Sequence, residues 1–398
     1  MFNQIFPYLF VYLSLVISII GFGSSLLRIL EKKNVIYNIN IGYIGLVGIF
    51  FCILYSYFTS YFFPHSQIHN SIFFFIGLIF FFNNLKLLKK EEINFLIFFF
   101  LIFFIGILNI KNHDDFSYYH FPYTFNLTQF SHFIGLGNFN HGFRTPSSIF
   151  YLNSLFYLPI LEKSLINSGA IFFLIFSNIF LIQKIFNQLK NKKYNFILIL
   201  SLFSLLFINT IFYRIAEHGT DRSALILIFI LAIYYLEGTN RKLSKINFKH
   251  YYQKILITVL LIVSLKSFYL IYTIFILILF FEYRKILLEK TYYKKIFFER
   301  VNYYFLIGIT IFIFTIFSNT GCLIYPASFT CVESFSWSIP KKEVIEMKTW
   351  YELWSKAGAS PTYRVDDVES YLSGLNWFPN WLQNHFFNKI SDFLLSLF

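Results

Sequence analysis

Charged side chains are scarce in this sequence. They make up 13% of its 398 residues, whereas soluble domains usually carry about a quarter. Residues 93–110 contain no charge at all over a length that matches the roughly 30 Å hydrocarbon layer of a bilayer. Because backbone groups in lipid must be satisfied within their own segment, such runs are expected to be helices. The sequence therefore predicts an all-α integral membrane protein.

Familiar nucleotide and metal motifs are also missing. The sequence has no Walker loop, no GxGxxG, no CxxC pair and no HExxH, which argues against a nucleotide-dependent enzyme or a zinc protease of the common kinds. The net charge of +13 could indicate nucleic acid, but Lys and Arg cluster in short loops between apolar runs. That distribution follows the positive-inside rule, so we expect no nucleic-acid partner.

The apolar runs predict about ten transmembrane helices. One of them, at 148–186, is a single span preceded by a re-entrant or interfacial piece. The others are expected at 5–27, 41–63, 71–87, 93–110, 195–212, 223–238, 254–265, 267–281 and 301–318. No internal repeat stands out.

The loops between these helices fall into two alternating sets. One set holds 21 of the 33 basic residues, within 28–33, 86–90, 184–193, 241–254 and 284–300. The other set is poor in Lys and Arg and comprises the N-terminus, 64–70, 111–147, 213–222 and 319–398. The positive-inside rule places the first set in the cytoplasm, so the N-terminus and the C-terminal tail are expected outside.

The external tail, 319–398, holds two of the three cysteines and all five tryptophans. Cys322 and Cys331 have eight residues between them, and an oxidising compartment favours a small-loop disulfide. The tryptophans suit the membrane–water interface, or alternatively the core of a small domain. Cys52 lies in an apolar helix and is expected only to pack.

The first long outer loop opens with a polar stretch directly after the fourth predicted helix. His113, Asp114 and Asp115 precede His120, which lies in an aromatic segment, 117–133, typical of an interfacial helix. Ionisable groups at a lipid boundary are costly and are candidates for function. A carboxylate here could take a proton from an acceptor hydroxyl, and the adjacent pair could hold Mg²⁺ or Mn²⁺. The structural alternative is that Asp114 caps the helix.

The outer loops also contain basic side chains that could meet an anionic substrate. Arg144 could grip a phosphate with two hydrogen bonds, unless it is a surface residue at a helix start. The next outer loop carries five ionisable candidates for substrate binding: Arg214, Glu217, His218, Asp221 and Arg222. Their structural alternative is a salt-bridge cluster in which Asp221 caps the following helix.

Lys266 is the most unusual single charge. It interrupts two apolar runs, 254–265 and 267–281, and a lysine in such a place is a functional candidate by default. Two short helices that meet at Lys266 would put it at the outer interface, where it could bind the phosphate of a lipid carrier. The alternative is a snorkelling lysine that only marks a turn.

The pattern resembles the GT-C superfamily of membrane glycosyltransferases, most closely an uncharacterised bacterial branch. Asp114–Asp115 at the start of an external loop, the following Tyr119–His120–Phe121–Pro122 and Lys266 between two later helices are similar to features of that family. Gly321–Cys322–Leu323–Ile324–Tyr325–Pro326, with Cys331, looks like a motif of uncharacterised bacterial multi-pass proteins. The resemblance implies a GT-C-like core at 93–318, a three-helix N-terminal addition at 1–92 and the small external tail. In this sequence the acidic motif follows the fourth helix, whereas in the family it follows the first.

By this resemblance the protein moves a sugar from a polyprenyl-phosphate donor at the outer face of the bacterial inner membrane. The small tail favours a glycan or lipid acceptor over a polypeptide. An aspartate, Asp114 or Asp115, would activate the acceptor hydroxyl, while Lys266 and an arginine hold the donor phosphate. Three other functions compete with this one: an O-antigen ligase or polymerase that depends on Arg and His, a transporter or flippase, and a non-catalytic membrane subunit.

Overall fold

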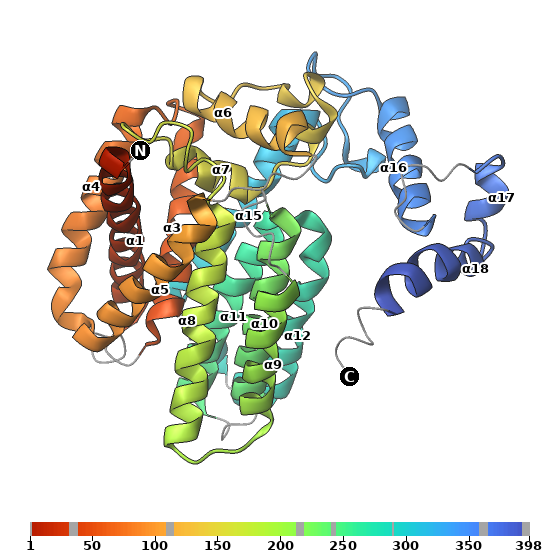
Figure 1. Ribbon diagram of the computed structural model, residues 1–398. Helices are drawn as coiled ribbons and strands as arrows, with labels where there is room; N and C mark the ends of the chain where they lie inside the picture. The colour runs from red at the N-terminus through yellow and green to blue at the C-terminus, as the bar shows by residue number, and fades with distance from the viewer. Residues whose placement is uncertain are drawn as a thin grey trace. The chain divides into compact units, whose positions relative to one another are not determined.

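The computed structural model describes residues 2–31, 39–108, 115–211, 219–239, 244–288, 290–357 and 365–391. Within these ranges the chain forms helices joined by turns and contains no β-strand (Figure 1). Two compact units are present. The first comprises Met1–Phe133 and Asn140–Thr315, and the second Ile134–Phe139 and Ile316–Phe398.

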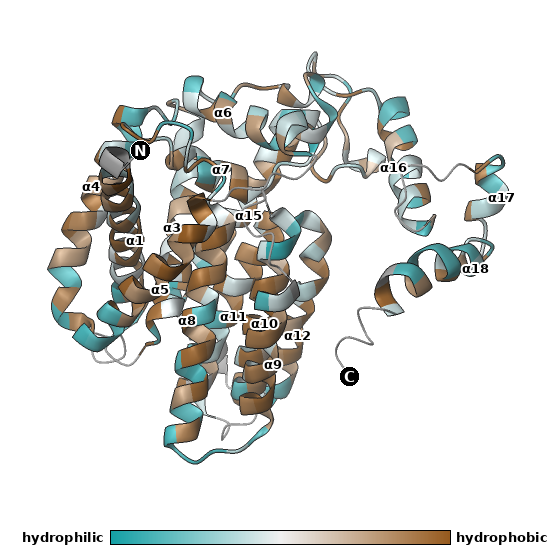
Figure 2. Ribbon diagram, in the orientation of Figure 1, coloured by the Kyte–Doolittle hydropathy of each residue, from teal (hydrophilic) through white to brown (hydrophobic). Residues whose placement is uncertain are grey.

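The first unit is a bundle of long apolar helices. Seven described helices are long and apolar enough to cross a membrane: α1 (Phe2–Leu30), α3 (Ile41–Ser60), α4 (Gln67–Asn84), α5 (Lys90–Leu108), α8 (Gly169–Lys190), α10 (Thr220–Thr239) and α15 (Arg300–Thr320). Shorter apolar helices are α9 (Phe196–Ile211) and α12 (Ile274–Glu282) with the 3-10 turn before it. Figure 2 shows hydrophobic residues along the lengths of α3, α8 and α10. The fold is that of a multi-pass helical membrane protein.

Small residues let the helices of this bundle approach closely. A Cβ added to Gly23 of α1 would collide with the Ile44 carbonyl of α3, and one added to Gly48 of α3 would collide with the Ile19 carbonyl of α1. In lipid, where hydrophobicity does not drive helices together, such close backbone packing holds them in place.

The helix ends of the bundle gather into two sets. One set lies at the end of the bundle that we call the basic end. There the Arg28 guanidinium donates a hydrogen bond to the Asn84 side-chain oxygen, and Lys184 pairs with Glu237 at 2.8 Å. The Tyr292 hydroxyl donates to the Lys245 carbonyl at the same end. This end holds the described parts of the Lys- and Arg-rich loops. The opposite end, the loop end, holds residues 61–66, 115–133, 140–147, 219–222 and 266. Within this unit, the described parts of the two sets of loops thus lie at opposite ends of the bundle.

One predicted helix start differs markedly from the structure. The helix before Lys266 is α11 (Lys245–Leu265), which begins nine residues earlier than the predicted 254. Its polar first turns are held by contacts that hydropathy does not register, such as the 2.7 Å ion pair between Lys249 and Glu299. The predicted 148–186 segment, by contrast, has the expected form: the short helix α7 (Ser148–Leu155) and an irregular stretch precede one long helix, α8, which begins at Gly169.

The second unit is built around the disulfide between Cys322 and Cys331, the pair expected from the sequence. Its main helix is α16 (Lys341–Lys356), on which the rings of Trp350 and Trp354 stack with centroids 5.3 Å apart. It is completed by η3 (Leu136–Asn138), η6 (Ser328–Thr330), α17 (Val368–Leu372), α18 (Phe378–Trp381) and η7 (Leu382–Ile390). The Asn138 amide donates to the Trp337 carbonyl at 2.7 Å and joins its two chain segments.

Candidate functional site

Six of the residues predicted to carry chemistry are described, and they lie at the loop end of the bundle. Asp115, His120, Arg144, Asp221, Arg222 and Lys266 are described there. His113, Asp114, Arg214, Glu217 and His218 lie outside the described residues. Cys322 and Cys331 belong to the second unit.

Lys266 forms an ion pair with Asp221. Helix α11 ends at Leu265, and the extended backbone of Lys266 (φ −156°, ψ 123°) separates it from the 3-10 helix η5 (Ser267–Thr273). Nζ of Lys266 lies 2.6 Å from Oδ1 and 2.7 Å from Oδ2 of Asp221, in the first turn of α10. The Tyr269 hydroxyl approaches Oδ1 of the same carboxylate at 3.5 Å. The two side chains are 46% and 48% exposed, so a substrate anion could reach the lysine.

Asp115 is held by the interfacial segment that follows it. This segment consists of the π-helical turn η2 (Phe116–His120) and α6 (Phe121–Gln129), whose first turn contains Pro122. The Tyr119 hydroxyl donates to Oδ2 of Asp115 at 3.3 Å. A proline is well tolerated in a first helical turn, because its missing N–H would have no intrahelical acceptor there. Asp115 makes no side-chain cap bond to η2, so its carboxylate is not used as a helix cap.

Arg144 is brought beside this segment by the short helix η4 (His141–Arg144). A Cβ on Gly142 would collide with the Tyr119 ring, so only glycine lets η4 lie against η2. The Asn140 amide fixes the contact by donating to the Tyr118 carbonyl at 3.0 Å. Arg144 is 7% exposed, which is a buried position for a guanidinium and unlike the surface arginine of the alternative interpretation.

The Arg144 segment and the Lys266 segment are tied together at the start of α7. The Ser147 hydroxyl donates to the Leu265 carbonyl at 2.7 Å, and the Ser264 hydroxyl donates to the Ser148 hydroxyl at 3.0 Å. Chain reach through Ser147 keeps the Cα atoms of Arg144 and Lys266 within about 22 Å of each other. Among the described residues, the only ionic partner of Lys266 is Asp221.

His120 and Arg222, the other two described candidates, are less exposed than residues of a solvated loop usually are. His120 is 4% exposed and packs between the rings of Tyr119 and Phe150, at centroid distances of 4.3 Å and 5.1 Å. Arg222 is half-buried beside Asp221 in the first turn of α10. His120 therefore supports the wall of the site, while Arg222 adds positive charge next to the ion pair.

A buried polar network under the loop end was not expected from the sequence. His65, which is fully buried, lies 2.6 Å from the Ser154 hydroxyl and 3.1 Å from the Thr59 hydroxyl through its two ring nitrogens. Burial, and secondarily the nearby His69, lowers the pKa of His65 to about 3. A histidine four residues before another in a short polar loop resembles a solvated residue, which is why the sequence did not single it out.

The same network continues through tyrosines. The hydroxyls of Tyr123 and Tyr151 lie 2.7 Å apart, and that of Tyr151 lies 3.3 Å from Nδ1 of His132. Burial raises the pKa of the Tyr151 phenol well above its usual value. Together with the bonds of His65 to Thr59 and Ser154, these neutral hydrogen bonds connect α6, α7 and the end of α3 beneath the loop-end residues.

No group of three or more His, Cys, Asp or Glu side chains suited to a metal ion occurs among the described residues. Asp115 contributes one carboxylate and Asp221 another, and the latter is taken by Lys266. A role for Mg²⁺ or Mn²⁺ at the adjacent aspartates stays a prediction from the sequence.

A family model described as "Domain of unknown function (DUF8201)" matches residues 6–398 of the chain. No curated protein and no solved structure matches it. The match covers both compact units, from α1 to the end of the sequence.

Proposed function

The chain belongs to the family described as a domain of unknown function (DUF8201), and from the residues at its loop end we propose that it is a membrane glycosyltransferase. It moves a sugar from a polyprenyl-phosphate donor to a glycan or lipid acceptor. The reaction takes place at the outer face of a bacterial inner membrane, in a GT-C-like core at 93–318 of a chain with about ten spans, whose N-terminus and tail lie outside.

The observation that carries the proposal is the exposed Lys266–Asp221 pair at the end of a membrane helix. An ammonium between apolar helices is costly, and this one is only loosely covered by its partner. A phosphate could displace the Asp221 carboxylate or share the ammonium with it, because Lys266 has three N–H donors for the two carboxylate oxygens. Arg144, buried on the adjoining segment, adds a cation with the planar fork that suits phosphate.

The chemistry uses these groups in separate roles. A carboxylate of the Asp114–Asp115 pair takes the proton of the acceptor hydroxyl. The hydroxyl oxygen forms a bond to the anomeric carbon, the bond from that carbon to the phosphate oxygen breaks, and polyprenyl phosphate leaves. Lys266 and Arg144 stabilise the charge that develops on the leaving phosphate. The tyrosine hydroxyl on Asp115 holds that carboxylate in orientation.

Sugar transfer by membranes that contain the full chain tests this proposal. A lipid extract of the native host supplies the donors, and folded protein is matched between samples. Lys266→Met and either Asp114→Asn or Asp115→Asn should reduce transfer, by about 100-fold or more for the true base. Lys163→Met and Glu162→Gln are matched controls, since both residues are exposed at the same end of the bundle.

Other outcomes favour other functions. Full activity of both Asp variants, with Arg144→Gln inactive, would overturn the aspartate mechanism and favour a ligase or polymerase that depends on Arg and His. No transfer by the unaltered protein with a competent donor pool would contradict the enzyme altogether. That result would favour a transporter, a flippase or a non-catalytic subunit.

A further inference from the structure

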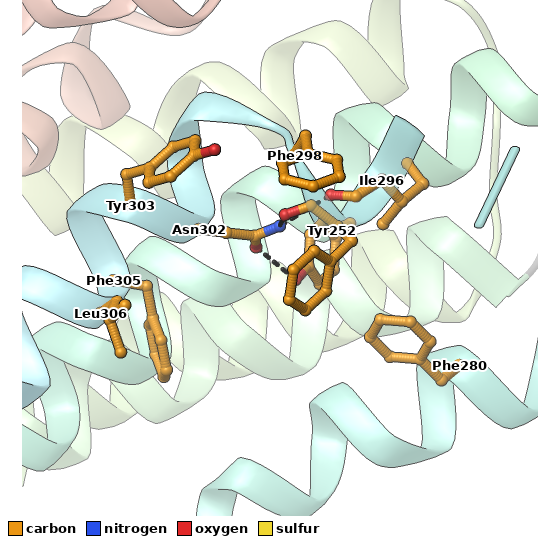
Figure 3. Close-up of a pocket in the computed structure, with 9 residues that line it drawn as sticks. Tyr252, Phe280, Ile296, Phe298, Asn302, Tyr303, Phe305 and Leu306 are labelled. Atoms are coloured by element: carbon orange, nitrogen blue, oxygen red, sulfur yellow. Dashed lines mark hydrogen bonds between the residues drawn. The ribbon is translucent and has the colours of Figure 1, made fainter. Parts of the chain in front are cut away.

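An apolar cavity opens on the side of the bundle near its basic end, far along the helices from the loop-end residues. Its volume is about 390 Å³, within the roughly 300–1,000 Å³ of known ligand pockets. Figure 3 shows its walls, which include Tyr252 of α11, Phe280 of α12, Ile296 of α14 (Lys290–Phe297) and Leu306 of α15. Four helices between residues 245 and 320 thus enclose one cavity.

Three polar side chains line this wall, and two of them, Tyr252 and Asn302, are held in hydrogen bonds, while Tyr303 is 51% exposed. The Asn302 carboxamide donates to the carbonyls of Ile296 and Phe297 at 2.7 Å and 3.0 Å, and its oxygen accepts from the Tyr252 hydroxyl at 2.5 Å (Figure 3). Asn302 thereby satisfies carbonyls at the C-terminus of α14 that have no partner within that helix. These bonds use both N–H groups of Asn302 and the O–H of Tyr252, and apart from Tyr303 the rest of the lining is aliphatic or phenylalanine, so the cavity suits a hydrocarbon chain.

Two lysines of α14 come directly before the lining residues Ile296 and Phe297 in the sequence. Lys294 and Lys295, both exposed, have no acidic partner among the described residues. The neighbouring Glu299 is already paired with Lys249 at 2.7 Å. Phe297, which lines the cavity two residues after Lys295, is 64% exposed. A short helix with lysines beside exposed aromatic side chains is typical of a membrane interface.

We propose that this cavity binds one acyl chain of an anionic phospholipid, whose phosphate lies against Lys294 and Lys295. The apolar wall accounts for the chain and the unpaired lysines account for the charge of the head group. A partner helix does not fit, since a helix is about 10–12 Å wide with its side chains. The lipid would stabilise the packing of α14 and α15 against α11, because its acyl chain would contact all three helices.

Lipid retention by the purified full-length protein tests the site. Native mass spectrometry would compare phosphatidylglycerol with phosphatidylcholine of the same acyl chains. We expect one phosphatidylglycerol to remain bound per protein, in preference to phosphatidylcholine. Leu306→Trp fills the cavity and should abolish this retention. Leu277→Trp, at a 67% exposed position of α12 that does not line the cavity, should leave it unchanged.

The head-group contact is tested separately at exposed positions, where folding is not at risk. Lys294→Gln combined with Lys295→Gln should lower phosphatidylglycerol retention by about fivefold for each lysine, the effect of a cation near an anionic surface. Lys192→Gln with Lys193→Gln, in another basic loop, is the matched control. Equal retention of both lipids by the unaltered protein, or equal losses in the two double variants, would overturn the proposal.

Discussion

Nζ of Lys266 lies within 2.7 Å of both carboxylate oxygens of Asp221, across 45 residues of sequence. Exposed ion pairs of this kind stabilise a protein by only about 0–1 kcal/mol. The stabilisation from this pair is therefore too small to explain a lysine between two apolar segments. An anionic substrate could open the pair at little energetic cost. This difference between stability and function gives the first prediction.

Lys266→Met should leave the unfolding temperature in detergent nearly unchanged, because less than about 1 kcal/mol of ion-pair energy is lost. Sugar transfer should fall by about 100-fold, the usual effect of removing one stabilising donor from a developing negative charge. Asp221→Asn, which releases the lysine without removing it, should reduce transfer less. A large loss of stability in Lys266→Met would instead assign the lysine a structural role.

Gly142→Ala should disturb the first loop. The new Cβ would occupy the position of the Tyr119 ring, so the ring must move and its hydrogen bond to Asp115 must break. We expect a loss of about 1–3 kcal/mol of stability together with reduced transfer. Gly106→Ala is the control, since nothing lies within 4 Å of its added Cβ in α5. Equal effects of the two alanines, measured by thermal unfolding and transfer, would contradict the proposed contact between η4 and η2.

The sequence singled out unusual charged residues, but it did not show which residues they contact. Lys266 stood out because apolar runs flank it on both sides, and that signal needs no structure. Its pairing with Asp221 depends on how α10 packs against α11, which no local pattern contains. The burial of Arg144 similarly depends on a contact that the sequence does not show. Gly142 lets the Arg144 segment lie against the Tyr119 ring, because a Cβ at this position would collide with that ring.

Hydropathy also placed a helix start wrongly where the first turns of the helix contain charged residues. The first turns of α11 contain lysines, so the predicted helix began too late. Contacts of Lys245 and Lys249 with other segments hold those turns in place. The cavity around Asn302 could not have been predicted, because residues of four helices contribute to it.

The disulfide of the second unit should form in cells if the tail faces an oxidising compartment. Closing so short a loop stabilises the folded state by about 2–3 kcal/mol in the chain-entropy description. Cys322→Ser with Cys331→Ser should lower the thermal stability, whereas the unaltered protein should give a disulfide-linked peptide by mass spectrometry under non-reducing conditions. Cys52, which is buried and free, provides the internal reference for a reduced thiol. Free thiols at both tail positions would contradict the external location.

Acid should destabilise the protein through His65. An unfolded histidine titrates near pH 6.5, whereas burial lowers the pKa of folded His65 to about 3. Between these values the unfolded chain binds one more proton, so stability falls as the pH is lowered from about 6.5 towards 3. The slope from this group reaches about 1.4 kcal/mol per pH unit. Thermal unfolding between pH 7 and 5 measures it.

The His65 contribution is separated from that of other groups by comparing slopes. His65→Gln keeps a neutral polar side chain but cannot take up the proton, so its stability should depend less steeply on pH than that of the unaltered protein. His385→Gln, a substitution of a half-buried residue in the second unit, should leave the slope unchanged. An equally steep loss of stability in His65→Gln would mean that another group takes up the proton. The buried network of Ser154, Thr59 and His65 would then be present without controlling acid stability.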